Sequence, residues 1–441
     1  MKILHYSLGF PPYRTGGLTK FCMDLMKQQV KEGHEVSLLW PGEMRFINKR
    51  TKIRNNKLIE GIKSYEVINP TPISFDEGIK DFDLFMCSGD RETYEQFLDN
   101  LKPEVIHVHT LMGLHKSLLD VAKNRDVRLV FTAHDFFPIC PKVTIFRHGE
   151  VCKCVDSCEE CGVCNNTALS IREIQILQSP FYRYLKDSAI VKRLRKQHRD
   201  NYLSETTENI DTVGTPKDYK RLRNYNYSML KLFDIVHYNS SVTKKVYEKH
   251  FGLDNCVQIS ITHSRIKDHK KIRIYDKPCL KIRYLGPKAN GKGYDILKNA
   301  VEKMWKEGRK VSLDVHFELE NKPDYIQCHG RFDANDLGEI FDDTDVLICP
   351  SVWYETFGYT VLEALSYGVP VVISDNVGAK DIMVDNAGFV INKITTEKLY
   401  IALSTLDSQK LRYMNESIYS KQPIKTIDEM EKEFESILYK C

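Results

Sequence analysis

The feature that most constrains the fold is a pattern that occurs twice along the chain: a short apolar run, a glycine-bearing loop and an amphipathic helix. In the first copy, the run Ile3–Ser7 is followed by Gly16 and Gly17 and then by apolar residues at helical spacing. In the second copy, the run Lys281–Leu285 is followed by a glycine- and lysine-bearing loop, Gly286–Gly293, and another helix. Short apolar runs that alternate with helices are typical of strands buried in parallel sheets. The pattern therefore predicts an α/β protein.

Two successive copies predict two doubly wound, Rossmann-like domains that face each other across a cleft. The length of 441 residues also favours more than one core. Further strands are expected at Val36–Leu39, Val105–His109, Arg128–Ala133, Ile235–Asn239, Leu313–Phe317, Asp345–Cys349 and Val369–Ser374. We expect an N-terminal domain over 1–265, a linker over 266–280, a C-terminal domain over 281–424, and a terminal helix in 425–441 that crosses back to the first domain.

Composition argues against several classes of protein. The formal net charge of +4 is small for this length, which argues against a nucleic-acid binder with a strongly basic face. The polar N-terminus does not resemble a signal peptide, and no uncharged run reaches the roughly 18 residues that a membrane-spanning helix needs. We therefore expect a cytoplasmic protein whose 13 cysteines are mostly reduced.

Two glutamates, Glu355 and Glu363, stand eight residues apart in the stretch YETFGYTVLEALSYGVP. The first is expected on a loop, and the second in the first turns of a helix that begins near Tyr359. The free backbone N–H groups at such a helix start make an anion site, and Gly358 lets a phosphate approach closely. A carboxylate in the helix can accept two hydrogen bonds from a ribose diol, and one in the loop can bind sugar hydroxyls. Phosphate, ribose and a further polar group together describe a sugar nucleotide.

The run ETFGYTVLEALSYGVPVVISD resembles the glutamate-x7-glutamate motif of glycosyltransferase family 4, which has the GT-B fold. The resemblance spans most of the chain and includes the glycine pair near the N-terminus, VIHVHT, TAHDFFPICP, DIVHYNSS, YLGPKANGKG and VLICPS. It implies a retaining, metal-independent transfer of a sugar from a nucleotide diphosphate. By this resemblance Glu363 binds the ribose and Glu355 binds the donor sugar near the reacting centre. The backbone that holds the diphosphate is then that of Phe357, Gly358, Tyr359 and Thr360.

The second glycine loop departs from the family at one position. The family places a glycine-arginine pair and, further on, a lysine-glycine pair against the phosphates. Gly286 and Lys292 match, but Pro287 stands where the arginine is expected. Lys288 is the candidate substitute, although it offers a point charge instead of a bidentate fork. An ordinary basic surface loop is the alternative.

The N-terminal half also carries candidate site residues. His134 ends a strand, and in the family this histidine reaches the donor sugar; a histidine that orders the following loop is the alternative. Gly16 and Gly17 are expected to contact the diphosphate or the acceptor, unless they only form a tight turn. His107 and His109 alternate on one strand and are expected to be structural.

A second constellation lies in the cysteines. Six of them fall between Cys140 and Cys164, in a segment with little apolar content of its own. In a reduced compartment, such C-x2-C spacing indicates a structural zinc site that supplies folding energy. The favoured ligands are Cys152, Cys158, Cys161 and Cys164. The absence of any metal and an iron–sulfur cluster remain alternatives.

The stretch 182–199 is basic, with apolar residues at near-helical spacing. Such a helix suits contact with an anionic membrane, although packing on its own domain is as good an interpretation. Contact at the inner face of the membrane would suit a lipid-linked acceptor.

The leading hypothesis is a retaining hexosyl- or related glycosyltransferase. It would transfer a sugar from a nucleotide-diphosphate donor, with UDP-sugars favoured because UDP is the commonest nucleotide in the family. The acceptor would be a glycan or a lipid-linked molecule, in the biosynthesis of cell-surface polysaccharide or glycolipid. The main alternative is a catalytically inactive scaffold that binds sugar nucleotides, which Pro287 supports. A phosphorylase-type enzyme on a similar fold is a weaker alternative, because it needs a cofactor lysine and a much longer chain. A zinc-dependent nucleic-acid binder is another, because too little of the chain is basic and both βα domains would be left unexplained.

Overall fold

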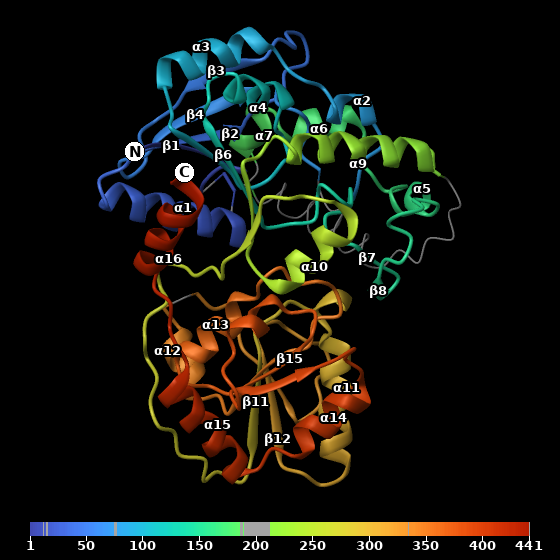
Figure 1. Ribbon diagram of the computed structural model, residues 1–441. Helices are drawn as coiled ribbons and strands as arrows, with labels where there is room; N and C mark the ends of the chain where they lie inside the picture. The colour runs from blue at the N-terminus through green and yellow to red at the C-terminus, as the bar shows by residue number, and fades with distance from the viewer. Residues whose placement is uncertain are drawn as a thin grey trace.

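The structure is a computed structural model of the chain, and it describes residues 1–11, 13–14, 16–74, 77–185, 188, 212–333 and 335–440. It consists of two stacked lobes, each built around a parallel sheet with helices on both faces (Figure 1). The chain completes the upper lobe before it enters the lower one, and its last helix then returns to the upper lobe.

The sheet of the upper lobe has eight strands in the described residues, in the order β10-β9-β6-β5-β1-β2-β4-β3. All neighbours are parallel except β3 and β4. Its strands in chain order are β1 (Lys2–Tyr6), β2 (Glu35–Pro41), β3 (Lys52–Asn55), β4 (Lys63–Ile68), β5 (Val105–Val108), β6 (Arg128–Ala133), β9 (Ile235–Tyr238) and β10 (Cys256–Gln258). A separate antiparallel hairpin pairs β7 (Phe146–Arg147) with β8 (Glu150–Val151).

The sheet of the lower lobe has six strands in the part of the chain that the structure describes, all parallel, in the order β13-β12-β11-β14-β15-β16. Its strands are β11 (Leu280–Tyr284), β12 (Val311–Val315), β13 (Ile326–Cys328), β14 (Val346–Cys349), β15 (Val371–Ser374) and β16 (Gly388–Ile391). In both sheets the carboxyl ends of the central strands carry the loops where α/β folds bind ligands.

Helices connect the strands in both lobes. Those of the upper lobe are α1 (Gly17–Lys31), α2 (Phe82–Phe85), α3 (Arg91–Leu101), α4 (Lys116–Lys123), α5 (Cys161–Cys164), α6 (Ile171–Leu177), α7 (Pro180–Leu185), α9 (Pro216–Leu230) and α10 (Ser241–His250). Those after the first sheet are η1 (Asn290–Lys292), α11 (Tyr294–Lys306), α12 (Leu337–Asp342), α13 (Tyr359–Ser366), η2 (Gly378–Ile382), α14 (Thr396–Ser404), α15 (Ser408–Lys421), α16 (Ile427–Phe434) and the π-helical turn η3 (Glu435–Tyr439).

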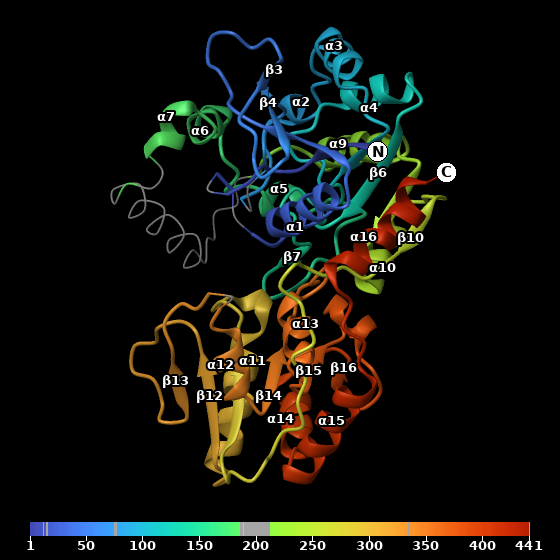
Figure 2. The same cartoon turned by 90° about the vertical axis from the view of Figure 1, so that its left-hand side faces the viewer.

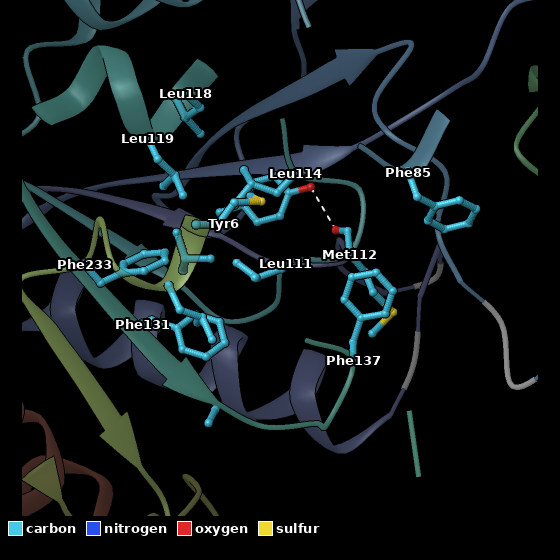
Figure 3. Packing of buried hydrophobic residues seen from close by; sticks show 14 of the residues in the cluster. Tyr6, Phe85, Leu111, Met112, Leu114, Leu118, Leu119, Phe131, Phe137 and Phe233 are labelled. Atoms are coloured by element: carbon cyan, nitrogen blue, oxygen red, sulfur yellow. Dashed lines mark hydrogen bonds between the residues drawn. The ribbon is translucent and has the colours of Figure 1, made fainter. Parts of the chain in front are cut away.

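The core of the upper lobe lies between its sheet and the helices that cover it. Alternate residues of β1, including Leu4 and Tyr6, pack there with Phe131 of β6 and with Leu118 of α4 (Figure 3). Each such fully buried side chain stabilises the fold by about 1.5–3 kcal/mol. The buried Tyr6 hydroxyl donates a hydrogen bond to the Met112 carbonyl at 3.1 Å, which fixes the loop after β5.

The C-terminal segment joins the two lobes. Helix α16 leaves the lower lobe and packs against α1, so that both chain ends lie on the upper lobe (Figures 1 and 2). Met430, Phe434 and Leu438 bury their side chains there, in one cluster with Phe21 of α1. Segment 266–280 runs along the lower lobe, where the Arg273 backbone N–H donates to Asn415 Oδ1 at 2.9 Å.

The predicted fold class, two doubly wound α/β sheets, is confirmed. Every predicted strand is present with its ends within two residues of the expected ones. Strands β3, β4, β10, β13 and β16 were not predicted; β4 lies next to the edge strand β3, and the other four are edge strands. Edge strands are exposed on one side and carry polar residues, as in KIRN of β3, so they lack the continuous apolar run of a central strand.

Candidate functional site

The loop after β14 holds the first glutamate at the junction of the two lobes. The Glu355 backbone N–H donates to the Asn376 carbonyl at 2.9 Å, and the Glu355 carbonyl accepts from the Gly378 N–H at 3.0 Å. The neighbouring Thr356 hydroxyl donates to the His134 carbonyl of the upper lobe at 3.2 Å. The Thr356 carbonyl in turn accepts from the Ser240 hydroxyl at 2.5 Å. The loop is therefore held by both lobes.

The Glu355 carboxylate is already paired with the lysine of the second glycine loop. Lys292 Nζ lies 2.5 Å from Glu355 Oε2, and each side chain is 23% exposed, so solvent or a ligand still reaches the pair. Trp353 Nε1 donates to the same oxygen at 3.2 Å. An added Cβ at Gly291 would lie 2.3 Å from the Trp353 ring, so glycine is needed for the close packing of the two loops. The pair concentrates one movable positive and one movable negative charge at the predicted sugar position.

The rest of the second glycine loop lies around this pair. Lys292 ends η1, and Gly293 follows with φ of 74° as the N-cap of α11. Gly286 packs against Tyr284, whose hydroxyl would lie 2.5 Å from an added Cβ. Lys288 is exposed. Only Lys292 of the two candidate lysines therefore has a fixed place at the site.

The N-terminus of α13 is built to receive an anion. Gly358 is its N-cap, with a left-handed φ of 100°, and no side chain caps the helix. An added Cβ at Gly358 would lie 2.9 Å from Val377, so only glycine fits without strain. Phe357 is buried and fixes the turn, whereas Tyr359 and Thr360 are half-buried at the start of the helix. The first turn of α13 thus leaves backbone donors for a phosphate.

Glu363 has a buried partner that the sequence analysis did not identify. Its Oε1 accepts a hydrogen bond at 3.1 Å from His263 Nε2, and the two side chains are 11% and 2% exposed. The Arg265 backbone N–H donates to His263 Nδ1 at 3.3 Å, which places the ring proton on Nε2, toward the carboxylate. His263 lies in the polar segment that leaves the upper lobe, and no local pattern links it to a glutamate 100 residues away.

The first glycine loop faces the start of α13. Gly16 has φ of 139° and is the N-cap of α1, which also lacks a side-chain cap. An added Cβ at Gly17 would lie 3.8 Å from the Tyr359 ring, so the N-termini of α1 and α13 meet. In contrast, α10, α14 and α15 each begin at a capping Ser, Thr or Asp side chain. Helices α1 and α13 thus meet with N-termini that no side chain caps.

His134 lies beside this meeting point. Its ring is 4.7 Å from Phe21 of α1, and its Nε2 lies 3.3 Å from His109 Nδ1. Burial lowers the pKa of His134 to about 3, so the imidazole is neutral at physiological pH. His107 and His109 are fully buried, and burial followed by neighbouring histidines lowers both of their pKa values.

The cysteine-rich insertion contacts the loop after β14 through β7, where the Phe146 ring lies 5.9 Å from Trp353. Cys140, Cys158 and Cys164 lie close enough to Cys161 to raise its pKa. The metal prediction is tested by asking which ligand atoms lie close together. Among the described residues, groups of at least three ligand atoms within 4.8 Å of one another are His5, His107 and His109, and His34, Glu431 and Glu435.

The four predicted zinc ligands are thus not gathered into one such group in the described structure. Cys158 Sγ instead accepts a hydrogen bond from Arg223 Nη2 at 3.2 Å. The Cys161 thiol and this guanidinium lower the pKa of Cys158. A four-thiolate site would require the sulfurs to move together.

Membrane contact was predicted for 182–199. Only 182–185 and 188 fall within the described residues, and the first four belong to α7. Within that described part of the chain, none of the helices combines the length and apolar composition that a bilayer span requires.

Comparison with known families divides the chain as the two lobes do. A model of Glycosyltransferase Family 4 matches residues 15–151, and a model of Glycosyl transferases group 1 matches residues 265–417. An uncharacterized glycosyltransferase of Methanocaldococcus jannaschii is 24% identical over 402 residues, 87% of this chain and 83% of that protein. An uncharacterized 41.2 kDa protein in the cps region of Klebsiella pneumoniae is 29% identical over 145 residues, 32% of this chain and 39% of that protein's length.

Solved structures share the architecture at low sequence identity. Sucrose-phosphate synthase from Thermosynechococcus elongatus superimposes with a TM-score of 0.58 at 12% identity, covering 99% of this chain and 97% of that one. An Anabaena protein solved in complex with UDP and glucose gives a TM-score of 0.54 at 15% identity, covering both chains completely. These similarities show the fold, and the GT-B prediction is confirmed.

Proposed function

The chain belongs to the glycosyltransferases of group 1 and family 4, and we propose that it transfers a sugar with retention from a nucleotide-diphosphate donor to a glycan or lipid-linked acceptor. The observation that carries this proposal is the start of α13. Its uncapped N-terminus lies between the Lys292–Glu355 pair and the His263–Glu363 pair. An anion site with a carboxylate on either side suits a diphosphate with ribose at one end and sugar at the other.

In this proposal the ribose binds at Glu363. His263 holds Oε1 of this carboxylate, while Oε2 has no hydrogen-bond partner in the described residues and is free for a ribose hydroxyl. The backbone N–H groups of residues 357–360 then take the diphosphate, with Gly16, Gly17 and Gly286 allowing close approach. Lys288 would supply the weaker charge that replaces the family's arginine.

The donor sugar binds at Glu355 and His134. Lys292 must leave Glu355 Oε2, or share it, when the donor arrives, because a diphosphate competes for the ammonium group. That exchange frees the carboxylate for sugar hydroxyls and moves positive charge to the leaving group, where negative charge develops.

Transfer then needs no side-chain nucleophile and no metal. The bond between the anomeric carbon and the diphosphate oxygen breaks, and the sugar passes through an oxocarbenium-like state. The acceptor hydroxyl oxygen bonds to that carbon on the same face, and its proton goes to the departing diphosphate oxygen. Lys292 and the start of α13 stabilise the diphosphate, so the rate depends on positioning and fixed charge.

We further propose that the enzyme acts in the biosynthesis of cell-surface polysaccharide or glycolipid. It would be cytoplasmic and would contact the inner face of the membrane through 182–199. The domain boundaries 1–265, 266–280, 281–424 and 425–441 are proposed with them. The exposed side chain of Tyr184, at 88%, supports the membrane contact, because an aromatic ring on a basic segment can insert at the membrane interface.

A structural zinc bound by Cys152, Cys158, Cys161 and Cys164 also remains a proposal. The proximity of several thiols to Cys161 supports it, while the sulfur placement and the Arg223 contact do not fit it. Metal analysis of the purified protein decides: one zinc per chain, lost with Cys161→Ser, supports the site, and a metal-free protein rejects it.

An inactive scaffold that binds sugar nucleotides is the second candidate function, favoured by Pro287 alone. A thermal-shift screen against UDP-, GDP-, ADP- and TDP-sugars, repeated with Glu363→Ala, tests donor binding. Saturating ligand at roughly a hundred times its dissociation constant raises the apparent stability by about 2.7 kcal/mol. A shift with one base, lost in the variant, supports the donor site; no shift with any base rejects it. Turnover of the bound donor then separates the enzyme from the scaffold.

A further inference from the structure

A continuous chain of hydrogen bonds runs through the core of the upper lobe and ends at His134. Eight hydrogen bonds connect the Ile259 carbonyl to His134 without a break. Its members, in order, are Ile259, His237, Thr132, His107, Tyr439, Gln29, His5, His109 and His134. Six of them come from β1, α1, β5, β6, β9 and the C-terminal turn η3, and His109, His134 and Ile259 directly follow β5, β6 and β10, so the chain crosses the sheet.

The direction of the chain is fixed at its first member. A backbone carbonyl only accepts, so His237 Nε2, 2.8 Å from the Ile259 oxygen, carries a proton. Burial lowers the pKa of His237 to about 4, so its Nδ1 is unprotonated and accepts from the Thr132 hydroxyl at 2.9 Å. Thr132 has then used its proton and accepts from His107 Nε2 at 2.7 Å. His107 Nδ1 accepts from the Tyr439 hydroxyl at 2.8 Å.

The same rule carries the direction to the site. The Tyr439 oxygen accepts from Gln29 Nε2 at 3.0 Å, and Gln29 Oε1 accepts from His5 Nε2 at 2.7 Å. Burial lowers the pKa of His5 to about 4, so its Nδ1 accepts from His109 Nε2 at 3.0 Å. His109 Nδ1 then accepts from His134 Nε2 at 3.3 Å. The proton of His134 is on Nε2, and its Nδ1 is a bare acceptor.

The opposite direction does not work. If the Gln29 amide were flipped, every proton between it and His237 would shift by one place. His237 would then donate from both nitrogens and carry a buried positive charge, with no carboxylate paired to it among the described residues. Burying an unpaired charge is far less favourable than rotating an amide. The Ile259 carbonyl thus sets one orientation for the whole chain.

A metal is not needed to explain this cluster. Three of its histidines, His5, His107 and His109, have ligand atoms within 4.8 Å of one another. Both ring nitrogens of each already have a hydrogen-bond partner. A metal ion would have to break several of these bonds to obtain a lone pair.

We infer that this chain holds His134 as the Nε2–H tautomer, so that the donor site selects a neutral sugar with a hydroxyl or amide N–H at His134 and rejects one with a carboxylate there. His134 is only partly buried, and its Nδ1 has no partner in the described residues. A hydroxyl can donate to this lone pair, whereas a carboxylate would place a second lone pair and a negative charge against it. The sugar preference rests on the proposed function; the tautomer does not. Tyr439, far from the donor, is a positioning residue in this arrangement.

The tautomer of His134 can be measured in the protein without ligand. Long-range ¹H–¹⁵N correlation spectra of protein labelled with ¹⁵N in its histidine rings distinguish protonated from bare ring nitrogens, and His134→Asn identifies the His134 signals. We expect His134 protonated on Nε2 alone. A proton on Nδ1, or on both nitrogens, overturns the inference.

Tyr439→Phe removes one oxygen from the middle of the chain and tests its connection. Because His237 stays anchored on Ile259, its signals should be unchanged, while His134 should become a mixture of tautomers. An unchanged His134 in a folded variant rejects the role of Tyr439. If this variant does not fold, Thr132→Val breaks the chain closer to its anchor and gives the same readout.

Matched donors test the sugar preference. Binding of UDP-glucose is compared with UDP-glucuronate, and GDP-mannose with GDP-mannuronate, by isothermal titration. The hexuronate should bind at least tenfold more weakly than its hexose for whichever base the protein accepts. Equal binding overturns the preference. If none of these donors and none of the ADP- and TDP-sugars of the screen binds, the proposed function fails, and the tautomer spectrum still decides the hydrogen-bond chain.

Discussion

The pair between His263 and Glu363 gives the sharpest test of the ribose site. His263→Ala deletes the imidazole that donates to Glu363 Oε1 at 3.1 Å, in surroundings where both side chains are nearly buried. The carboxylate keeps its place on α13 but loses the donor that orients it. His269→Ala is a matched control, because His269 lies in the same segment, is exposed and stacks on Tyr367, and no described hydrogen bond joins its ring to Glu363.

The expected loss of donor affinity follows from the strength of a hydrogen bond to a charged group. A hydrogen bond to a charged group contributes about 1.5–3 kcal/mol. Since each 1.4 kcal/mol is about a tenfold change in binding, donor affinity should fall by roughly ten- to a hundredfold if Glu363 needs His263 to hold the ribose. The folded state should lose a similar free energy, because Glu363 is then left with one desolvated oxygen unpaired.

The assay is isothermal titration of the nucleoside diphosphate that the screen selects, with His263→Ala, Glu363→Gln and the double variant. If His263 acts through Glu363, the double variant should bind no more weakly than Glu363→Gln alone. Additive losses would show that His263 acts on the ligand in another way. A loss with His263→Ala no larger than with His269→Ala would refute the reasoning.

Three further perturbations test other parts of the site and the fold. Gly358→Ala places a side chain at a φ of 100°, with its Cβ 2.9 Å from a neighbouring valine, and should destabilise by about 1–3 kcal/mol in urea unfolding and abolish the donor thermal shift. In Gly308→Ala the φ is 84° and an added Cβ meets nothing within 4 Å, so this variant should lose only the free energy of the strained backbone. It should keep the thermal shift on donor binding. Lys292→Met should lower kcat by roughly 10²–10³-fold, whereas the exposed Lys288→Met should lower it by less than about tenfold; equal effects would reject the assigned roles. Glu431 is buried with no hydrogen-bond partner for either oxygen, and its Oε1 lies 3.6 Å from His34 Nε2; burial, followed by neighbouring carboxylates, raises its pKa from 4.5 to about 7, so the folded state loses stability as pH rises through that window. Glu431→Gln should therefore raise Tm at pH 8 and leave it nearly unchanged at pH 4, and a gain at pH 4 of the same size would contradict the burial argument.

Features determined by neighbours in the sequence could be predicted. The glycine starts of α1 and α13 are visible because glycine suits an N-cap residue with a positive φ. The central strands are visible because strands covered on both faces are continuously apolar. The loop position of Glu355 and the helical position of Glu363 followed from the strand before them and the glycine between them.

Features determined by distant parts of the chain could not be predicted. Tyr439 meets His107 across 332 residues, and His263 meets Glu363 across 100. Neither contact leaves a periodic pattern, because each depends on how α16 and the segment after β10 return across the lobes. His107 and His109 were expected to be structural from their alternation, but their role in orienting His134 depends on which nitrogen each presents.

The cysteine spacing shows a further limit of local patterns. A C-x2-C repeat indicates that thiols can converge, but the backbone between them decides whether they do. Here Cys158 turns toward Arg223 and Cys161. The spacing alone therefore does not decide whether these thiols bind a metal, and the zinc site stays a prediction.

The central claim is that Glu363 binds the ribose and Glu355 binds the transferred sugar, on either side of a diphosphate held by α13. One titration series separates these roles: the nucleoside diphosphate and its sugar form, each against wild type, Glu363→Gln and Glu355→Gln. Glu363→Gln should weaken both ligands by the same factor, because both contain the ribose. Glu355→Gln should weaken only the sugar form, because the bare diphosphate lacks the group that this carboxylate binds. Equal weakening of both ligands by Glu355→Gln, or no effect of Glu363→Gln on either, would contradict the account.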